Sequence, residues 1–312
     1  MIDQFASDVL AGLRAEPKWL PSKYFYDPTG DRLFQQIMEL DEYYLTRTEY
    51  AILDTYKQEM LELFGNDGTP FNLIEFGAGD GYKTKILLNH FLKEKADFTY
   101  MPIDISGHAL DELTRNLNEE LPSLEVKGIE NDYFKALDEL RYEGRRNVVL
   151  FLGSNIGNFT GEQAHLFLEQ LYASLRTGDM VMIGFDLKKN PDLILAAYDD
   201  SQGVTRDFNL NLLKRINESL DGNFDLSAFK HHATYNPLTG TTSSYLVSTR
   251  EQIVEIMDAA IHFRPWEAIH MEISQKYDER MIEDLAMTSG FAIVKHFSDV
   301  NSYYFDSVWM KK

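Results

Sequence analysis

One short stretch, LIEFGAGDGYKT at residues 73–84, constrains the fold of this chain more than any other. An apolar run ends in a cluster of glycines, and a helical pattern opens directly after it. This order predicts a buried strand, a tight turn and a helix N-terminus. Gly77, Gly79 and Gly81 can adopt positive φ and let the backbone approach a ligand where a Cβ would collide. The free N–H groups of the helix then offer a site for a carboxylate or phosphate.

The glycine spacing and two nearby acids favour one cofactor. The pattern Gly-x-Gly-x-Gly differs from the Gly-x-Gly-x-x-Gly fingerprint of dinucleotide-binding proteins. Glu75 stands just before the first glycine, and Asp104 ends the next apolar run, at 98–103. This arrangement fits S-adenosylmethionine, with Asp104 accepting both ribose hydroxyls and the helix N-terminus holding the methionine carboxylate. The alternative is a glycine-rich connector of the kind found in any α/β protein.

Between residues 72 and 186, short β-rich runs alternate with helical patterns, which is typical of a parallel sheet covered by helices on both faces. Ligands of such sheets bind beyond the carboxyl ends of the strands. Polar residues there are therefore site candidates: Glu75, Asp104, Asp132 with Tyr133, the segment 153–159 and Asp186. A carboxylate with an aromatic ring beside it suits an adenine base, although Asp132 also suits a helix N-cap.

The alternation stops after Asp186, and the pattern of residues 188–276 indicates an inserted α+β domain. A turn signal at 237–240 joins two of its strands. The last residues then resume the first domain and close its sheet with an antiparallel hairpin. We expect helices at 2–13, 31–39, 46–64, 192–198, 204–219 and 278–288, and strands near 72–76, 98–103, 123–128, 147–152, 179–186, 227–235, 241–247, 252–263, 291–297 and 302–310.

The composition excludes several classes of function. The 312 residues are 44% hydrophobic, enough for one large or two smaller domains. Fifty acids against 30 bases give a net charge of -20, which repels nucleic acids and anionic membranes. The chain has no cysteine, and the adjacent pair His231-His232 would point to opposite faces of a strand, so we expect no metal. With no signal pattern and no long uncharged apolar run, we expect a cytoplasmic protein. We also expect a monomer.

Several segments, in order over nearly the whole chain, resemble the histidine-specific Nα-methyltransferase family. These enzymes make trimethylhistidine (hercynine) for ergothioneine biosynthesis. The matching segments are LPSKYFYD at 20–27, EYYLTR at 42–47, the glycine stretch at 75–84, FLGSNIGN at 151–158, AYDD at 197–200 with GVT at 203–205, and EISQKY at 272–277.

The resemblance implies a Rossmann-like class I S-adenosylmethionine-dependent methyltransferase fold with a mixed seven-stranded sheet. Residues 1–187 and 277–312 would form the methyltransferase domain, and residues 188–276 would form the inserted substrate-binding domain. The cofactor would be S-adenosylmethionine and the substrate a small amino acid, L-histidine. Cofactor contacts are predicted for Gly77, Lys83, Asp104 and Asp132, and the remaining members of the predicted cofactor site are Glu75, Gly79, Tyr133 and Gly153.

The resemblance also implies roles around the substrate. Tyr43 and Asn158 would be the catalytic pair at the α-amino group, with Tyr26 beside them. Asn158 and Tyr198 would hold the carboxylate, and Glu272 with Ser274 would hold the imidazole.

The spacing of Glu272 and Ser274 supports their role independently. Residues two apart in an extended segment project to one face, so a carboxylate and a hydroxyl there can satisfy both imidazole nitrogens. The alternative is a surface Glu and a helix N-cap Ser. Two other functions stay open: methylation of another aromatic amino acid, such as a tryptophan derivative, because residues 229–263 match the family poorly, and cofactor binding without catalysis. Glu272 argues against an indole, which offers only one donor.

Overall fold

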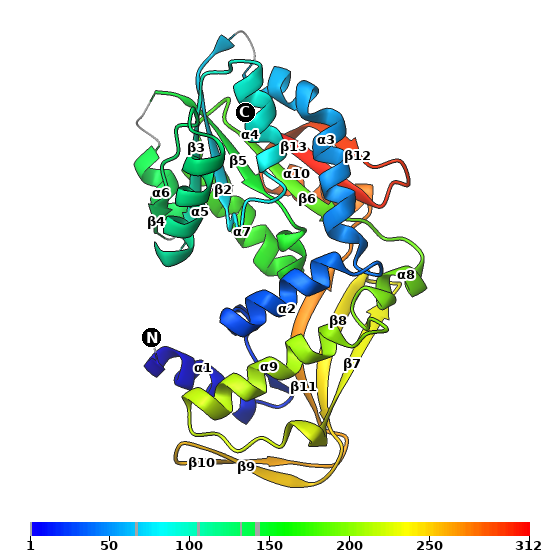
Figure 1. The fold of residues 1–312 in the computed structure, drawn as a ribbon. Helices are drawn as coiled ribbons and strands as arrows, with labels where there is room; N and C mark the ends of the chain where they lie inside the picture. The colour runs from blue at the N-terminus through cyan, green and yellow to red at the C-terminus, as the bar shows by residue number, and fades with distance from the viewer. Residues whose placement is uncertain (1, 66–67, 105–106, 132, 141–143) are drawn as a thin grey trace. The chain divides into compact units, whose positions relative to one another are not determined.

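The structure is a computed structural model that describes residues 2–65, 68–104, 107–131, 133–140 and 144–312. The chain divides into two compact units, shown in Figure 1. Unit 1 contains Met1–Tyr44 and Lys188–Lys276, and unit 2 contains Leu45–Leu187 and Tyr277–Lys312. The chain leaves unit 2 after residue 187 and returns to it at residue 277.

Unit 2 is built on a mixed sheet of seven strands among the described residues, in the order β12-β13-β6-β5-β2-β3-β4. Strands β2 to β6 run parallel, and β13 joins antiparallel to β6. This confirms the predicted α/β class and the closing hairpin. The strands are β2 Phe71–Phe76, β3 Phe98–Asp104, β4 Ile129–Glu130, β5 Arg146–Phe151, β6 Met180–Asp186, β12 Phe291–Ser298 and β13 Tyr304–Lys311.

The sheet of unit 2 is buried on both faces because helices cover each of them. All six residues of β2 are buried, as expected for a central parallel strand. Their side chains alternate: Leu73 belongs to one apolar core and Ile74 to the other. The first core contains residues of α3 (Tyr44–Phe64), α4 (Lys85–Lys93) and α5 (Gly107–Glu120), and the second contains residues of α6 (Tyr133–Leu140), α7 (Gly161–Ser174) and α10 (Glu279–Thr288).

The strand predicted at 123–128 is wrong in position. Only Val126 in that range pairs with the sheet, through an isolated bridge to Tyr100. The regular ladder resumes at Ile129, which lies opposite Ile103. β4 is the edge strand and pairs only with β3. The chain from 123 to 130 therefore meets β3 at two places, the bridge of Val126 and the two residues of β4, and forms no continuous ladder.

Unit 1 combines helices with a second sheet, in the order β1-β11-β8-β7. Its predicted turn at 237–240 joins β7 to β8, as expected. The elements are α1 Ile2–Arg14, β1 Lys18–Trp19, α2 Pro28–Glu39, α8 Pro191–Ala196, α9 Val204–Ser219, β7 Phe229–Asn236, β8 Thr241–Ser248, β9 Gln252–Ile256, β10 Ala259–Phe263 and β11 Ala268–Gln275.

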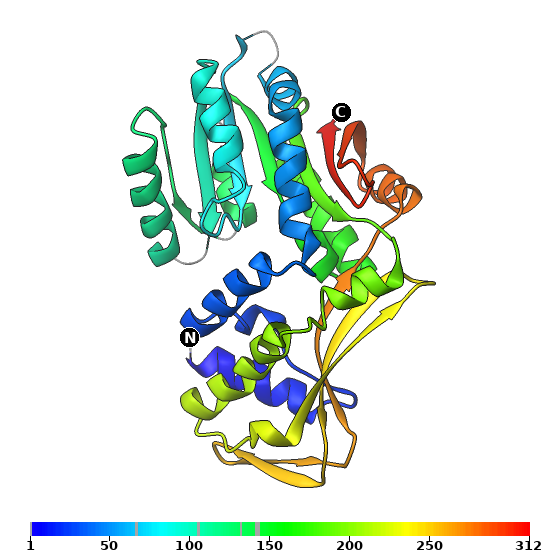
Figure 2. The same cartoon turned by 45° about the vertical axis from the view of Figure 1, so that its right-hand side comes forward.

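The first 44 residues belong to unit 1, whereas the sequence analysis placed them with the methyltransferase sheet. Their apolar side chains share one core with α9 and the sheet of unit 1, where Val9 and Ile37 lie in the same cluster as Leu212. Figure 2 shows the N-terminal helices beside α9. The Asn211 amide also donates to Asp27 Oδ1 over 2.9 Å. Residues 1–44 therefore belong to unit 1 because the apolar faces of α1 and α2 are buried in its core, although they precede the strands of unit 2 in the chain.

The single strand predicted at 252–263 is a hairpin of two strands. Ile256 pairs with Ala259 across a connection of two residues, Met257 and Asp258. Met257 adopts φ +51°, a conformation that two-residue hairpin turns require and that Gly or Asn usually supplies. The sequence therefore contained no turn signal at this point.

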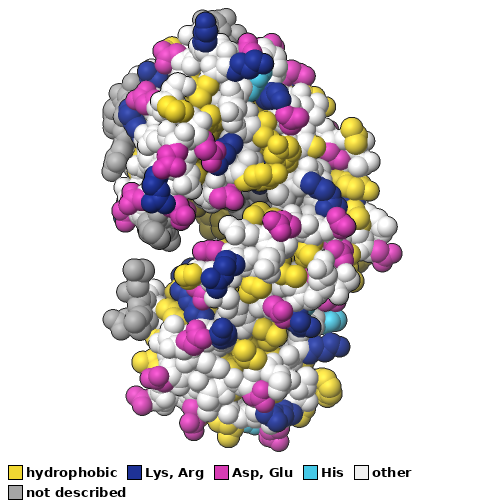
Figure 3. Space-filling model, viewed as in Figure 1, with side chains coloured by type: hydrophobic (Ala, Val, Ile, Leu, Met, Phe, Trp, Pro, Cys, Tyr) yellow, Lys and Arg dark blue, Asp and Glu magenta, His cyan; other side chains and the backbone are white. Residues whose placement is uncertain are grey.

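Figure 3 shows one face of the molecule, on which acidic and basic side chains are intermixed. The excess of acids is spread over this face and forms no single patch. Within the described residues, no helix is both long enough and apolar enough to cross a membrane.

Candidate functional site

The glycine turn of unit 2 has the predicted conformation. Gly77, Gly79 and Gly81 adopt φ of +68°, +56° and +68°. Thr84 is the N-cap residue of α4, which begins at Lys85. A Cβ on Gly81 would lie 3.0 Å from Leu113, whereas a Cβ on Gly79 would meet no atom within 4 Å. The backbone at Gly79 is therefore open to the close approach of a ligand.

Glu75 fastens this turn to the sheet. Its carboxylate is buried and accepts hydrogen bonds from the hydroxyls of Thr84 over 2.7 Å and Tyr100 over 2.5 Å. Burial raises the pKa of Glu75 to about 7, and the two hydroxyls and the Lys83 ammonium oppose that shift. Both carboxylate oxygens accept hydrogen bonds from residues of unit 2, so Glu75 holds the glycine turn in its conformation. Direct contact with the cofactor stays a prediction.

Glu49 of α3 links the glycine turn to the turn after β5, and the sequence analysis missed it. Its buried carboxylate forms an ion pair with Lys83. It also accepts the Gly153 N–H and the Tyr304 hydroxyl, each over 2.7 Å. Nothing in the helical pattern at 46–64 marks this residue, because its partners come from three distant segments.

The other predicted cofactor residues of unit 2 lie at the same edge of the sheet. Asp104 ends β3 and is half-buried. The Tyr133 ring stacks on Phe76, with ring centroids 4.3 Å apart and an interplanar angle of 4°. A Cβ on Gly77 would lie 3.2 Å from the Tyr133 hydroxyl, so Tyr133 stands against the glycine turn. Asp132 lies outside the described residues.

The turn after β5 carries two consecutive left-handed residues, Gly153 at φ +76° and Ser154 at φ +55°. The Ser154 hydroxyl accepts the N–H of Asp186, which is fully buried at the end of β6. A short 3-10 helix, η3 (Asn155–Asn158), follows and leaves Asn158 exposed. The sheet therefore places Asn158 just beyond the carboxyl end of β5.

Unit 1 brings together most of the residues predicted to bind substrate. The Tyr198 hydroxyl donates to Ser274 Oγ over 2.8 Å. The Tyr26 residue is 46% exposed. Desolvation of its hydroxyl, and then the nearby charges of Glu272, Asp31 and Tyr198, raise its pKa.

An aromatic group connects the other two tyrosines of unit 1. The Phe34 ring lies 5.7 Å from the ring of Tyr26 and 6.3 Å from that of Tyr43. Tyr26 and Tyr43, which come from two different loops, therefore flank one phenylalanine.

Glu272 and Ser274 both lie in β11, so neither a surface Glu nor a helix N-cap Ser describes them. A β-bulge precedes Glu272, but no register shift separates it from Ser274, and the two side chains share a face as expected. Glu272 is half-buried and Ser274 is 5% exposed. Burial raises the pKa of Glu272 to about 7, and the Lys276 ammonium acts in the opposite direction.

Lys276 is a second residue that the sequence analysis missed. It is fully buried, and its ammonium donates to Tyr198 Oη over 2.6 Å and to Ser274 Oγ over 2.7 Å. Continuing the alternation of Glu272 and Ser274 by one more step would have found it. The predicted substrate site of unit 1 thus has four polar groups near the end of β11. They are the carboxyl of Glu272, the hydroxyls of Ser274 and Tyr198, and the ammonium of Lys276.

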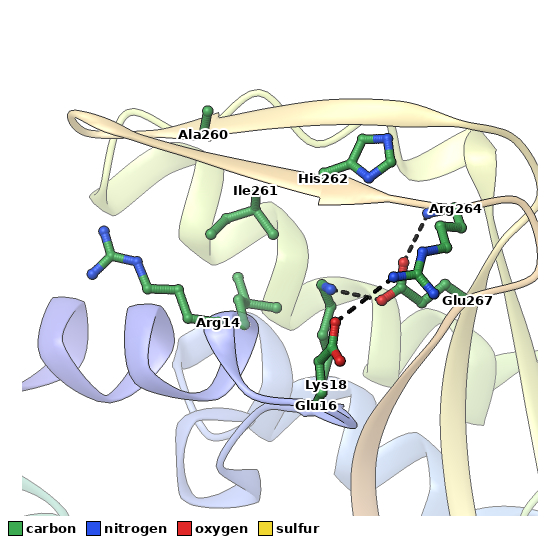
Figure 4. Close-up of a pocket in the computed structure, with 9 residues that line it drawn as sticks. Arg14, Glu16, Lys18, Ala260, Ile261, His262, Arg264 and Glu267 are labelled. Carbon is green, nitrogen blue, oxygen red and sulfur yellow. Dashed lines mark hydrogen bonds and ion pairs between the residues drawn. The ribbon is translucent and has the colours of Figure 1, made fainter.

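A separate cavity of about 210 Å³ in unit 1, shown in Figure 4, contains none of the predicted site residues. Two ion pairs line it: Lys18 pairs with Glu267 over 2.6 Å, and Arg264 lies 3.8 Å from Glu16. Arg14 is a further cation of its lining. We do not assign it to the reaction, because none of the predicted site residues line it. In the part of the chain that the structure describes, no cluster of three or more His, Cys, Asp or Glu is arranged to hold a metal ion.

Comparison with known proteins identifies the family. A family model described as "Histidine-specific methyltransferase, SAM-dependent" matches residues 5–311. Histidine N-alpha-methyltransferase of Mycolicibacterium smegmatis is 37% identical over 282 residues, which cover 89% of this chain and 86% of that protein. The protein of the same name from Mycobacterium tuberculosis is 33% identical over 294 residues, 94% of this chain and 90% of that protein. Ergothioneine biosynthesis protein 1 of Schizosaccharomyces pombe is 29% identical over 292 residues, 91% of this chain and 38% of that protein. The chain belongs to the histidine-specific, S-adenosylmethionine-dependent methyltransferase family and is an enzyme of that class.

Proposed function

We propose that this enzyme methylates the α-amino group of L-histidine, up to trimethylhistidine. The observation that carries the proposal is the pair on one face of β11, a half-buried Glu272 carboxyl two residues before a buried Ser274 hydroxyl. An imidazole ring has two nitrogens in positions to meet such a pair. The 37% identity to a relative named for histidine Nα-methylation supports the same substrate.

The residues of unit 2 fit S-adenosylmethionine. A Cβ built on Gly79 meets no atom within 4 Å, so the turn has room for a ligand against its backbone. Asp104 at the end of β3 would accept the ribose hydroxyls, and the turn before α4 would lie along the methionine moiety. When bound, this cofactor supplies a methyl group on a sulfonium centre.

The chain's own task in such a transfer is to align a neutral amine and to exclude water. Tyr43, held against Phe34, would orient the amine from its loop. The aromatic group of Tyr26, Phe34 and Phe208 would stabilise the single positive charge that forms on the nitrogen in each transfer, by about 0.5–2 kcal/mol. The nitrogen loses a proton before it accepts the next methyl group. The second residue predicted to act on the amine, Asn158, is exposed at the end of η3.

The test is transfer of a labelled methyl group from S-adenosylmethionine to each free amino acid, with tryptophan included as the aromatic alternative. Histidine should be labelled on its α-nitrogen and, with time, carry three labels by mass spectrometry. Labelling of tryptophan in preference to histidine would support the alternative substrate. No label on any amino acid would overturn the proposal.

A further inference from the structure

A buried lysine at the end of β11 controls what the Ser274 hydroxyl can do. Lys276 is fully buried, which is rare for a lysine unless its charge is well partnered. Its ammonium donates to Tyr198 Oη and to Ser274 Oγ, and it lies 4.6 Å from the centroid of the Tyr198 ring. With the bond between the two hydroxyls, these groups form a closed triangle.

Counting hydrogens and lone pairs fixes the direction of the triangle. A serine hydroxyl has one hydrogen to donate and two lone pairs to accept with. Ser274 Oγ accepts from the Lys276 ammonium over 2.7 Å and from the Tyr198 hydroxyl over 2.8 Å. A phenol is more acidic than an aliphatic alcohol, so the tyrosine is the natural donor of this pair. With both lone pairs occupied, Ser274 can only donate its own hydrogen, and it must point out of the triangle.

The neighbouring carboxyl supplies the opposite function. Glu272 lies two residues earlier on the same face of β11. Above its pKa of about 7 the group is mainly an ionised carboxylate, which can only accept. We propose that Lys276 is a positioning residue that makes Ser274 an obligate hydrogen-bond donor, so that the Glu272–Ser274 pair selects a neutral ring with one N–H and one unprotonated nitrogen. This inference rests on the proposed function, because such a ring is the neutral imidazole of histidine. A pyrrole or an indole offers the N–H alone.

The experiment compares histidine with 3-(pyrrol-2-yl)alanine, whose ring has a similar size but lacks the acceptor nitrogen. The wild-type enzyme should favour histidine in kcat/KM by about tenfold, because the Ser274 donor is left unpaired against pyrrole. In Lys276→Met, both hydroxyls lose the lysine donor, so the Ser274 hydrogen can turn back to Tyr198 Oη and is no longer left unpaired against pyrrole. The preference for histidine should therefore fall toward one, mainly through KM. Lys230→Met, at an exposed position of β7 in the same unit, should keep the wild-type preference.

The absence of cysteine from the chain allows a sharper version. Lys276→Cys, alkylated in denaturant with bromoethylamine and refolded, regains an ammonium at the length of a lysine. The same variant alkylated with an ethyl halide is similar but uncharged. The preference for histidine should return only in the aminoethylated protein. Equal preferences in both alkylated proteins, with matching thermal unfolding midpoints, would overturn the role of Lys276. Failure of the wild-type enzyme to methylate histidine would instead overturn the proposed function.

Discussion

At the scale of single residues, burial decides the chemistry of the two carboxyls singled out by the sequence. The pKa of Glu75 and that of Glu272 are both raised to about 7, but their surroundings differ. Both oxygens of Glu75 accept hydrogen bonds from Thr84 and Tyr100 within unit 2. Glu272 lies half-buried on a strand face beside the charge of Lys276. The first residue therefore shapes a turn, whereas the second stays the predicted contact of the imidazole.

Glu272→Ala should weaken histidine binding by about 10- to 100-fold, because a hydrogen bond to a charged group contributes about 1.5–3 kcal/mol. The dissociation constant of S-adenosylmethionine should change less than about twofold. Isothermal calorimetry with each ligand checks both values. Glu255→Ala, which removes an exposed carboxyl from β9 of the same unit, is the matched control. Equal losses of affinity for the two ligands would contradict the imidazole role.

Glu75→Gln should destabilise the protein more at pH 5 than at pH 8. The folded state holds the Glu75 proton up to a pKa of about 7, whereas the unfolded chain loses it near the ordinary value of 4.5. The free energy of unfolding of the wild type therefore falls as the pH rises through this window, by up to about 3 kcal/mol from this group. Glutamine has no such proton. Urea unfolding at the two pH values measures the difference, and the same destabilisation at both would contradict the shift.

At the scale of elements, the turns that follow the strands, and not the strands themselves, carry most of the predicted cofactor site. The turns after β2 and β5 contain five residues in left-handed conformation, at 77, 79, 81, 153 and 154. Glu49 of α3 ties them together through Lys83 and the Gly153 N–H. A helix residue thus holds two turns in register at the edge of the sheet.

Gly77→Ala should weaken S-adenosylmethionine binding by about tenfold, while Gly178→Ala should leave it unchanged. Both glycines have positive φ, at +68° and +88°, so both substitutions should cost about 1 kcal/mol of stability. Only the Cβ at residue 77 meets a neighbour, the Tyr133 hydroxyl at 3.2 Å. Cofactor calorimetry alongside thermal unfolding separates the two effects. Equal affinity in both variants would show that the turn does not contact the cofactor.

Glu49→Gln should lower the free energy of unfolding by about 2–4 kcal/mol, because it leaves Lys83 without its nearly buried counter-charge. Cofactor affinity should fall with it if Lys83 binds S-adenosylmethionine. Glu59 lies on the same helix as Glu49 and forms an exposed ion pair with Lys295 of β12. Glu59→Gln breaks that pair and should lower the free energy of unfolding by less than about 1 kcal/mol. Chemical unfolding of the two variants gives the comparison, and similar losses would argue against the network.

At the scale of the whole molecule, two units with separate cores divide the predicted work. The cofactor residues that the structure describes lie in unit 2, and Tyr26, Tyr43, Tyr198, Glu272 and Ser274 lie in unit 1. Each unit has its own sheet and buried clusters. The two sets of residues therefore have independent scaffolds.

S-adenosylmethionine at 100 times its dissociation constant should stabilise the protein by about 2.7 kcal/mol and raise the unfolding midpoint by several degrees. NAD at the same concentration should not, because the glycine spacing differs from the dinucleotide fingerprint. Scanning calorimetry with each ligand checks this. Stabilisation by NAD alone would contradict the cofactor assignment.

The sequence by itself determined the strand–turn–helix around Gly77, the alternation of strands and helices, the inserted segment and the Glu272–Ser274 pair, because these depend on local periodicity and on spacing over a few residues. Only the tertiary structure placed residues 1–44 with unit 1, moved the edge strand to Ile129, and brought Glu49 to Lys83 and Lys276 to Tyr198. Those outcomes depend on which apolar faces are buried together and on partners far apart in the chain. Glu49 and Lys276 are buried charged residues whose partners lie far away in the sequence, so their roles become visible only after folding has brought the partners into contact.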